Sequence, residues 1–182
     1  MAGIEKELKE IDGMKSFLFI MDAGKLQDNL IALIKFLNAK GMSGACICLN
    51  KPFKSLKSML ESKKVNTKNI LFIDTLSSSR TELKPKEGAI MISNPSELTS
   101  ISLAAGGFAK SNSGKRFIII DALSTLLIYN HPDAVAKFTR YMASLTSSQG
   151  IKLIVLTTES LNDRILPKVQ PFFDRIVRLD KK

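Results

Sequence analysis

The sequence contains few of the residues on which many catalytic and metal sites depend. Its 182 residues include a single histidine, His131, and no tryptophan. One histidine excludes metal sites built from several histidines and acid/base mechanisms that use a histidine pair. His131 precedes a proline in a polar stretch, and we expect it to be a solvated loop residue.

Cysteine is almost as scarce. The two cysteines, Cys46 and Cys48, are two positions apart in an apolar stretch. In a strand both side chains would point to one face, about 6.5–7 Å apart along the chain, which exceeds the reach of an ordinary disulfide. Because no suitable further metal ligands lie nearby in the sequence, we expect buried, reduced thiols and a reducing compartment.

Long apolar runs are also missing. No stretch approaches the length of a membrane-spanning helix, about 20 residues. The first ten residues mix charged and apolar side chains and do not form a signal peptide. Hydrophobic residues make up 45% of the chain and charged residues 24%, which is typical of globular proteins and excludes disorder, collagen and coiled coil. A cytoplasmic protein without membrane contact is therefore expected.

Positive charge is in excess. The 27 Lys and Arg residues outnumber the 17 Asp and Glu residues, so the formal net charge is +10, which invites a nucleic-acid or anionic-membrane interpretation. Residues 50–68 carry six lysines and one acid, and residues 110–116 carry three further cations. The candidate partner- or phosphate-binding lysines are Lys51, Lys54, Lys57, Lys63 and Lys64. With no tryptophan and two tyrosines the chain offers little for base stacking, so a solvated helix face is favoured, with an acidic protein partner or loose phosphate contact as the functional alternative.

Short apolar runs, typical of strands that are covered on both faces, alternate with segments of helical spacing. The expected strands are 17–21, 45–49, 70–74, 89–92, 117–121, 153–157 and 175–179. The expected helices are 26–40, 52–60, 95–109, 133–145 and 161–169. This alternation predicts a three-layer α/β domain with a mostly parallel central sheet over residues 16–182, preceded by an N-terminal extension over 1–15.

Three segments carry more specific expectations. The run at 117–121 is the most hydrophobic and is expected at the centre of the sheet. The run at 175–179 alternates and is expected at an edge. Residues 75–88 have no sustained period and are rich in serine and lysine, so they are expected to be the most mobile loop.

Four segments at expected strand ends follow one another in a familiar order. They are Leu49–Leu56, Asn69–Asp74, Arg116–Leu127 with its apolar run ending in Asp121, and the polar strand end Leu156–Glu159. In this order and spacing nearly the whole chain resembles the RecA/KaiC superfamily of P-loop ATPases, in particular its KaiC-like archaeal branch. The third segment is similar to the family's Walker B strand. The resemblance implies a RecA-like fold with a ligand site at the carboxyl ends of the strands.

The stretch that corresponds to the family's phosphate-binding loop departs from its pattern. A Walker A loop reads G-x-x-x-x-G-K-[ST]: its backbone N–H groups wrap the phosphates, its lysine meets their charge and its hydroxyl binds Mg²⁺. The chain keeps Gly24 and Lys25, but Phe19 stands at the first glycine position and Leu26 at the hydroxyl position. Asp22 would also place a carboxylate beside incoming phosphates.

A second part of the ATPase machinery is unmatched. Active KaiC-like relatives carry a carboxylate at the end of the second strand that helps to activate the attacking water, whereas this chain has Asn50 and Lys51 there. Neither residue is a general base at neutral pH. The resemblance therefore implies a degenerate nucleotide site with no catalytic residue, no metal and no expected cofactor, with Mg·ATP as the alternative.

Several strand-end residues keep two interpretations. Asp121 is either a Mg²⁺ ligand or a structural carboxylate, and the structural role is favoured. Ser124 either assists Asp121 or caps the following turn. Glu159 is expected to cap a helix start, with an inter-subunit contact as its alternative. The candidate cofactor-binding residues of this vestigial or atypical site are Gly24, Lys25, Asp121, Ser124, Thr157 and Glu159.

The leading hypothesis is a non-catalytic pseudo-ATPase domain that acts as a regulatory or protein-interaction module, for example in signal transduction. The family habit of assembling into rings or pairing with active relatives implies a protein partner or a homo-oligomer. Two alternatives stay open. One is an atypical ATP-binding protein or weak ATPase that uses Gly24, Lys25, Asp121 and Thr157. The other is a non-specific nucleic-acid-binding relative of the recombinases that uses the lysines of residues 50–68.

Overall fold

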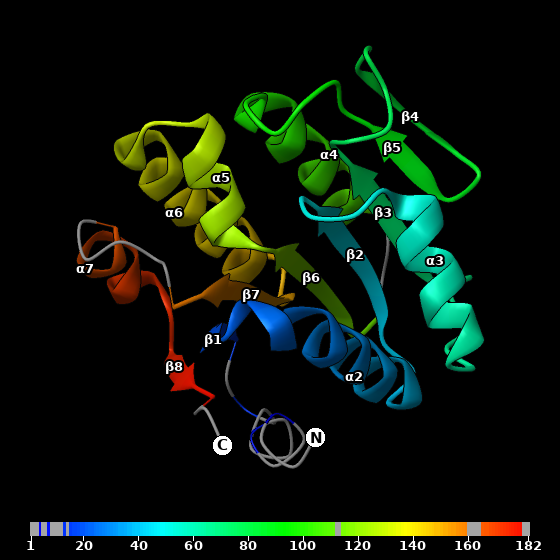
Figure 1. Ribbon diagram of the computed structural model, residues 1–182, viewed down its shortest axis with the longest axis horizontal. Coiled ribbons are helices and arrows are strands. Elements are labelled where there is room, and N and C mark those ends of the chain that lie inside the picture. The colour runs from blue at the N-terminus through cyan, green and yellow to red at the C-terminus, as the bar shows by residue number, and fades with distance from the viewer. Residues whose placement is uncertain are drawn as a thin grey trace.

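The computed structural model describes residues 4, 7, 13, 15–111, 114–159 and 165–179 of the chain, and these form three layers (Figure 1). An eight-stranded sheet lies in the middle. Helices α2 (Leu26–Ala39) and α3 (Phe53–Ser62) cover one face, and α4 (Leu98–Ser111), α5 (Leu123–Tyr129) and α6 (Pro132–Ser148) cover the other. Within the described part, no helix is both long enough and apolar enough to cross a membrane.

The strands of the sheet are ordered β4-β5-β3-β2-β6-β7-β1-β8. Their bounds are β1 Ser16–Met21, β2 Ser43–Cys48, β3 Ile70–Asp74, β4 Glu82–Lys86, β5 Ala89–Met91, β6 Arg116–Asp121, β7 Lys152–Thr158 and β8 Arg175–Arg178. Every pairing is parallel except the one between β4 and β5. A short helix, α7 (Leu166–Val169), and a 3-10 turn, η2 (Gln170–Phe172), precede β8. The carboxyl ends of the parallel strands therefore all lie at one edge of the sheet.

The central strands are buried on both faces because helices cover both sides of the sheet. All six residues of β1 and all six of β6 are buried. Phe17 and Phe19 belong to an apolar cluster with residues of α2 and α3, whereas Leu18 and Ile20 belong to a second cluster with residues of α4, α5 and α6. Burial on both faces explains why these strands appear in the sequence as continuous apolar runs.

The structure confirms the predicted three-layer α/β fold with a mostly parallel sheet. The run at 117–121 forms the central strand β6, between β2 and β7, and the run at 175–179 forms the edge strand β8. Both cysteines are buried and free, as expected. Of the helix expected over 161–169, the structure describes α7, and residues 160–164 lie outside the described part.

The boundary between an extension over 1–15 and a domain over 16–182 stays a prediction. Described residues of the first segment contact the rest of the chain, among them Lys15, whose backbone N–H donates to the carboxylate of Asp174 at 2.8 Å. Ile4 is buried in the cluster that includes α2 and α3. Glu7 accepts a hydrogen bond from the guanidinium of Arg175 at 2.6 Å.

The local structure differs from the prediction in two places. Residues 75–88, expected to be a mobile loop, contain β4, which pairs with β5 across a turn in which Glu87 and Gly88 have φ angles of 53° and 85°. All five residues of β4 are exposed, so the strand has no apolar face that would reveal it in the sequence. Helix α5 is absent from the predicted elements. A single residue, Ala122, separates it from β6, and its buried Leu123 and Leu126 extend the apolar run of that strand.

Candidate functional site

The carboxyl edge of the parallel sheet is the candidate site, because open α/β sheets bind ligands there. Strands β2, β6, β7 and β1 are consecutive neighbours in the sheet. Asn50 follows β2, Asp121 ends β6, Glu159 follows β7 and Asp22 follows β1. Segments that are far apart in the sequence therefore deliver polar side chains to the same edge.

The connection between β1 and α2 is short and is held by a hydrogen bond within the turn. A single 3-10 turn, η1 (Ala23–Lys25), joins the two elements. Asp22 caps this turn, because its Oδ1 accepts a hydrogen bond from the backbone N–H of Gly24 at 2.8 Å. Leu26, the first residue of α2, is buried in the same core cluster as Phe19. A carboxylate of the chain itself thus binds the Gly24 N–H.

Asp121 belongs to a polar network that joins three elements. The residue is only 2% exposed, and the peptide bond that follows it is cis. Its Oδ1 accepts a hydrogen bond from the side-chain amide of Asn50 at 3.1 Å. The amide oxygen of Asn50 accepts a hydrogen bond from the hydroxyl of Thr125 at 2.5 Å. Asn50 therefore ties the end of β6 to the first turn of α5.

Burial governs the titration of Asp121. It raises the pKa of the carboxyl from an ordinary value of 3.8 to about 6, while the hydrogen bond from Asn50 and the positive charge of Lys51 act in the opposite direction. At neutral pH the carboxyl of Asp121 is therefore mostly ionised. Its hydrogen-bond partner is the neutral amide of Asn50, and it has almost no contact with solvent.

A second buried carboxylate, Asp74 at the end of β3, makes its hydrogen bonds within the chain. It accepts from the backbone N–H groups of Phe53 at 2.9 Å and Leu76 at 2.8 Å, and from the hydroxyl of Ser77 at 2.5 Å. The N–H of Phe53 is the first of helix α3, and the N-cap residue Pro52 provides no side-chain cap. Asp74 therefore caps α3 from a neighbouring strand.

Cys48 lies between these two carboxylates, in register with Asp74 on β3 and with Asp121 on β6. Its thiol donates a hydrogen bond to the carbonyl of Cys46 at 3.6 Å. The hydrogen bond with Cys46, burial and the two nearby negative charges all raise the pKa of the Cys48 thiol. The thiol is therefore neutral near pH 7 and a poor nucleophile.

Thr157 does not share a sheet face with Asp121. In the register between β6 and β7, Asp121 is paired with Leu156, whose side chain belongs to the cluster of α2 and α3. Thr157 is the next residue, so its side chain points to the opposite face. It is fully buried, and within the described residues its hydroxyl has no hydrogen-bond partner.

The other candidate residues are at least partly exposed. Ser124 lies in the first turn of α5, but the N-cap of that helix is Ala122. Of the two interpretations left open for Ser124, the one in which it caps the turn is therefore wrong. Ser124 also lines a cavity of about 420 Å³ beside the end of β7. Lys25 is exposed at the N-cap of α2, and Glu159 is exposed directly after β7. Glu159 is expected to cap the start of a helix. Residues 160–164, which follow it, lie outside the described part, so this expectation stays a prediction.

His131 is exposed, as expected. It is the N-cap of α6, and its Nδ1 accepts a hydrogen bond from the backbone N–H of Asp133 at 3.3 Å. An imidazole used in this way stabilises the start of a helix, and its position in the sequence before Pro132 is typical of such a cap.

The candidate lysines of the 50–68 segment are spread along α3. Lys51 precedes the helix and acts electrostatically on Asp121. Lys54 and Lys57 lie on the helix, and Lys63 and Lys64 follow its last residue. A helix of ten residues is about 15 Å long. The first and last of these lysines therefore lie near opposite ends of the helix.

The sequence does not predict the bridge that Asn50 and Thr125 form. Asn50 lies 71 positions from Asp121 and 75 from Thr125, so no local pattern connects them. The one signal that could have pointed to both is their position, just beyond the carboxyl ends of two buried strands.

Solved structures with a similar fold are known. The KaiC-like protein PH0186 from the hyperthermophilic archaeon Pyrococcus horikoshii has a TM-score of 0.66 at 11% identity, over 91% of this chain and 71% of that one. The uncharacterized protein PH0321 from Pyrococcus horikoshii, solved in complex with an unknown peptide, has a TM-score of 0.69 at 13% identity, over 98% and 84%. The solved ATPase domain of a third protein has a TM-score of 0.64 at 11% identity, over 95% and 74%. The fold is therefore RecA/KaiC-like.

Comparison with known sequences gives a match to one family model. No curated protein matches the chain. A family model matches residues 31–182, from within α2 to the C-terminal residue, and describes a family of unknown function, DUF7090. Since the match covers most of the sequence, the chain belongs to the DUF7090 family.

Proposed function

We propose that the chain is a non-catalytic RecA/KaiC-like domain, a pseudo-ATPase, that acts as a regulatory or protein-interaction module. The observation that carries the proposal is the hydrogen bond from the Gly24 N–H to the carboxylate of Asp22. In a phosphate-binding loop, backbone N–H groups at this position point at the phosphates. Here the N–H is already bonded, and a negative charge stands where an anionic ligand would approach.

Electrostatics and packing both oppose phosphate binding at this turn. Two unit charges 4 Å apart repel by about 1 kcal/mol in water and by about 4 kcal/mol near a protein surface, and a triphosphate carries several charges. Leu26 has no hydroxyl for Mg²⁺, and its side chain is buried in the core. Widening the turn would therefore require that Asp22 release its N–H and that Leu26 leave the core.

The position after β2, where a base for hydrolysis would be expected, is occupied by an amide. Asn50 is neutral, and both ends of its amide are engaged, one with Asp121 and the other with Thr125. Such an amide cannot take a proton from an attacking water. Asp121 is ionised at neutral pH, but at 2% exposure it has almost no access to solvent.

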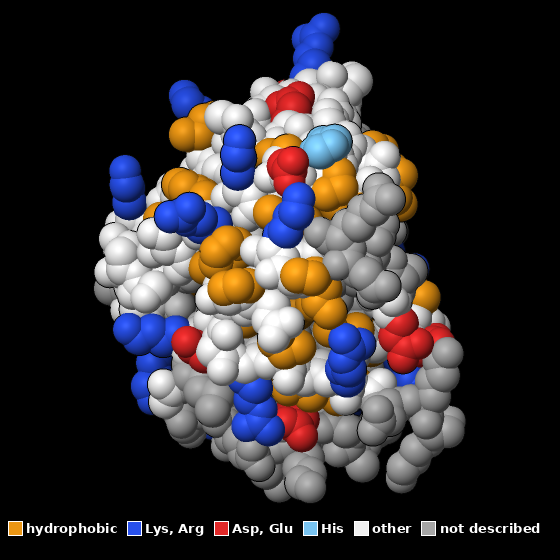
Figure 2. Space-filling view, turned by 90° about the vertical axis from the view of Figure 1, so that its left-hand side faces the viewer, with side chains coloured by type: hydrophobic (Ala, Val, Ile, Leu, Met, Phe, Trp, Pro, Cys, Tyr) orange, Lys and Arg blue, Asp and Glu red, His pale blue; other side chains and the backbone are white. Residues whose placement is uncertain are grey.

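Exposed apolar side chains support an interaction role. Figure 2 shows hydrophobic side chains among polar ones on the side of the molecule that carries α5, α6 and α7. Ile128 and Tyr129 of α5 are 76% and 50% exposed, and Tyr141 of α6 is 45% exposed. Large apolar side chains that gather at a surface mark contacts with other proteins. A partner docked on α5 would touch the helix that carries Thr125.

Titration calorimetry with Mg·ATP tests the proposal. We expect no Mg²⁺-dependent binding tighter than about 1 mM, because the turn after β1 offers a carboxylate instead of free N–H groups. We also expect phosphate release no faster than that of a Lys25→Ala control. Micromolar Mg·ATP binding that the substitution Asp121→Ala abolishes would overturn the proposal, provided that circular dichroism shows the variant to be folded.

The alternative of an atypical ATP-binding protein or weak ATPase has one observation in its favour. Lys25 is exposed and lies at the same edge of the sheet as Asp121. Turnover that exceeds the Lys25→Ala control would favour this alternative. Equal rates in the two proteins would leave the pseudo-ATPase as the better account.

A further inference from the structure

Helices α4 and α6 pack against each other on one face of the sheet, and each exposes a large apolar side chain. Leu103 of α4 is 58% exposed, and Tyr141 of α6 is 45% exposed. The hydroxyl of Tyr141 lies over α4, 3.7 Å from the position that a Cβ at Gly106 would occupy. Residues three apart are neighbours on a helix surface, so Leu103, Gly106, Gly107 and Tyr141 form one patch, the α4–α6 surface.

The two adjacent glycines of this surface lie inside α4. Glycine destabilises a helix interior relative to alanine. Neither Gly106 nor Gly107 has a positive φ angle. Within the described part of the chain, a Cβ at Gly107 would meet no atom within 4 Å, and one at Gly106 would make only an ordinary contact with Tyr141. The fold itself therefore gives no reason for these glycines, which leave a stretch of backbone open to close approach by a second helix.

Positive side chains flank the α4–α6 surface. Lys110 lies two turns after Leu103 and on the same face of α4. Arg140 directly precedes Tyr141 on α6. Both cations are exposed, so each stands beside one of the two exposed apolar side chains.

The two helices offer these cations no acidic partner. Helix α4 contains no acidic residue, and α6 contains one, Asp133. The carboxylate of Asp133 is paired with Lys168 and also feels the charge of Lys137. Lys110 and Arg140 form no ion pair with any residue that the structure describes. The α4–α6 surface therefore combines apolar side chains with uncompensated positive charge.

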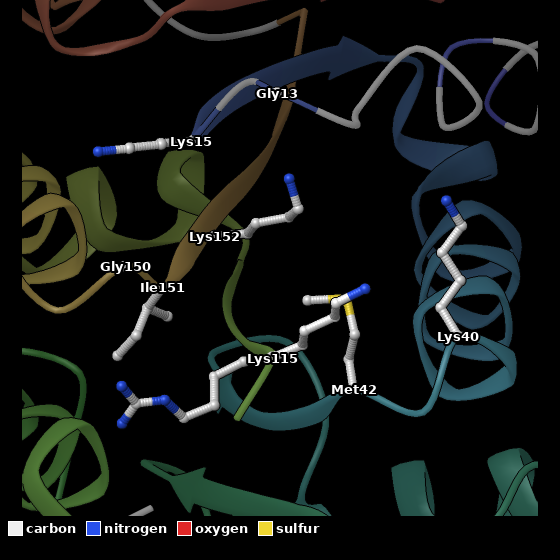
Figure 3. Close-up of a pocket in the computed structure, with 9 residues that line it drawn as sticks. Gly13, Lys15, Lys40, Met42, Lys115, Gly150, Ile151 and Lys152 are labelled. Carbon is white, nitrogen blue, oxygen red and sulfur yellow. The ribbon is translucent and has the colours of Figure 1, made fainter. Parts of the chain in front are cut away.

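The lysines at the amino ends of the strands are placed differently. They line a cavity of about 420 Å³ beside β1, β2, β6 and β7, which Figure 3 shows with Lys15, Lys40, Lys115 and Lys152. The ammonium of Lys40 lies over the ring of Phe36, 4.9 Å from its centre. Arg116, which also lines the cavity, donates to the carbonyl oxygen of Ala109 at 2.6 Å. Cations of this cavity are therefore engaged by the chain itself, unlike those beside the α4–α6 surface.

We propose that the α4–α6 surface docks an amphipathic helix of an acidic partner protein. The apolar stripe of that helix lies between Leu103 and Tyr141, its backbone passes over the two glycines, and acidic side chains beside the stripe meet Lys110 and Arg140. A nucleic acid fits less well, because its phosphates would meet the cations and leave Leu103 in water. This docking mode presupposes the interaction role proposed above and specifies the partner.

Fluorescence anisotropy with designed helical peptides tests the docking surface. One peptide of about 20 residues has leucine and alanine along one stripe and glutamate on the remaining face, and a second has lysine in place of every glutamate. We expect the glutamate peptide to bind the full chain with a Kd of about 10–100 µM, and the lysine peptide to bind about tenfold more weakly or worse. Binding of the glutamate peptide weaker than about 1 mM, or equal binding of the two peptides, would overturn the proposal.

A matched pair of variants locates the peptide. Leu103→Ser/Tyr141→Ser and Ile128→Ser/Tyr129→Ser each remove one exposed aliphatic side chain and one exposed tyrosine, the first from the α4–α6 surface and the second from α5. We expect the first pair to weaken binding about tenfold or more and the second less than about threefold, with circular dichroism showing both to be folded. An equal or larger loss in the α5 variant would overturn the α4–α6 surface and leave the interaction role to α5.

Gly107→Ala separates docking from stability. Alanine is the better helix former, and its Cβ meets open space, so the thermal unfolding midpoint should rise by about 2–4 °C. The same Cβ stands between α4 and an approaching helix, and we expect it to weaken peptide binding about threefold or more. A variant that is more stable and binds the glutamate peptide unchanged would contradict the proposed docking mode.

Two further measurements distinguish the other outcomes. We expect single-stranded DNA of about 20 nucleotides not to displace the glutamate peptide. DNA binding that depends on Lys110→Ala/Arg140→Ala but not on Leu103→Ser/Tyr141→Ser would assign the surface to a nucleic acid and overturn the proposal. Calorimetry with Mg·ATP should give the same result for Leu103→Ser/Tyr141→Ser and the unsubstituted protein, so a failure of the pseudo-ATPase proposal is recognised separately from a failure of the docking surface.

Discussion

At Asp121 two physical effects of opposite sign act on one carboxylate. Burial disfavours the charge, whereas the Asn50 amide and the charge of Lys51 favour it. Burial is the larger effect, and the pKa accordingly rises to about 6. The ionised Asp121 therefore lowers the stability of the folded protein at neutral pH.

The substitution Asp121→Asn should stabilise the protein near neutral pH. Between about pH 4 and pH 6 the folded state holds a proton that the unfolded chain has lost, so the free energy of unfolding falls as the pH rises through this window. The full penalty is present above pH 6 and amounts to about 1–3 kcal/mol. Asparagine removes the charge and keeps an acceptor for the Asn50 amide.

Urea unfolding at about pH 7.5 and about pH 4 measures this effect. We expect the difference in unfolding free energy between Asp121→Asn and the unsubstituted protein to be present at the higher pH and to vanish at the lower one. The substitution Asp121→Ala serves as the control, because it removes the acceptor as well as the charge. A loss of stability in Asp121→Asn at neutral pH would contradict the account given for this residue.

Helix α3 depends on a residue from another element for its first hydrogen bond. Its N-cap, Pro52, has no side-chain acceptor, and Asp74 at the end of β3 accepts the N–H of Phe53 instead. We expect Asp74→Ala to lower the free energy of unfolding by about 2–4 kcal/mol, because the N–H groups of Phe53 and Leu76 would lose their acceptor.

Chemical denaturation and amide hydrogen exchange measure the loss. Exchange should accelerate in the first turn of α3 more than in α6, whose own cap is His131. The substitution Asp74→Asn retains an acceptor and should lose less stability than Asp74→Ala. If both variants were as stable as the unsubstituted protein, the cap would contribute nothing.

The elements that the sequence predicts are those whose burial leaves a pattern. Strand β6 is buried at every residue and is therefore visible as an apolar run. Strand β4 is exposed at every residue and leaves no such pattern, although the Glu87–Gly88 turn is typical of a hairpin with two positive φ angles. Helix α5 has seven residues, too few for a helical period to emerge.

The same reasoning separates what could be predicted of the candidate site from what could not. The carboxyl edge was predictable, because Asp22, Asn50 and Asp121 each follow an apolar run and parallel strands end together. The contact of Asn50 with Asp121 was not, since it depends on which strands are neighbours.

The net charge of +10 acts on the whole molecule. An excess of like charge opposes the compact state through self-repulsion, and salt screens that repulsion. We expect the thermal unfolding midpoint to rise when the ionic strength increases from about 10 mM to about 150 mM. Differential scanning fluorimetry with sodium chloride measures this rise.

Two controls make the salt experiment specific. Sucrose at equal osmolality carries no charge. It should not reproduce the dependence of the thermal unfolding midpoint on concentration that sodium chloride gives. Lys54→Glu/Lys57→Glu lowers the net charge by four and should make the midpoint less dependent on salt. A midpoint that falls with sodium chloride would mean that ion pairs such as Lys168–Asp133 outweigh the repulsion.

Strand β1 lies between β7 and β8, and this position has a consequence for how the chain is made. Residues 16–21 are synthesised before the rest of the sheet, yet they pair with residues 153–158 and 175–178. A nascent chain must therefore keep one of its most apolar segments unpaired until β7 has left the ribosome. Folding of the sheet is for this reason tied to the late stages of synthesis, and a chain that stops before residue 150 has neither neighbour for its first strand.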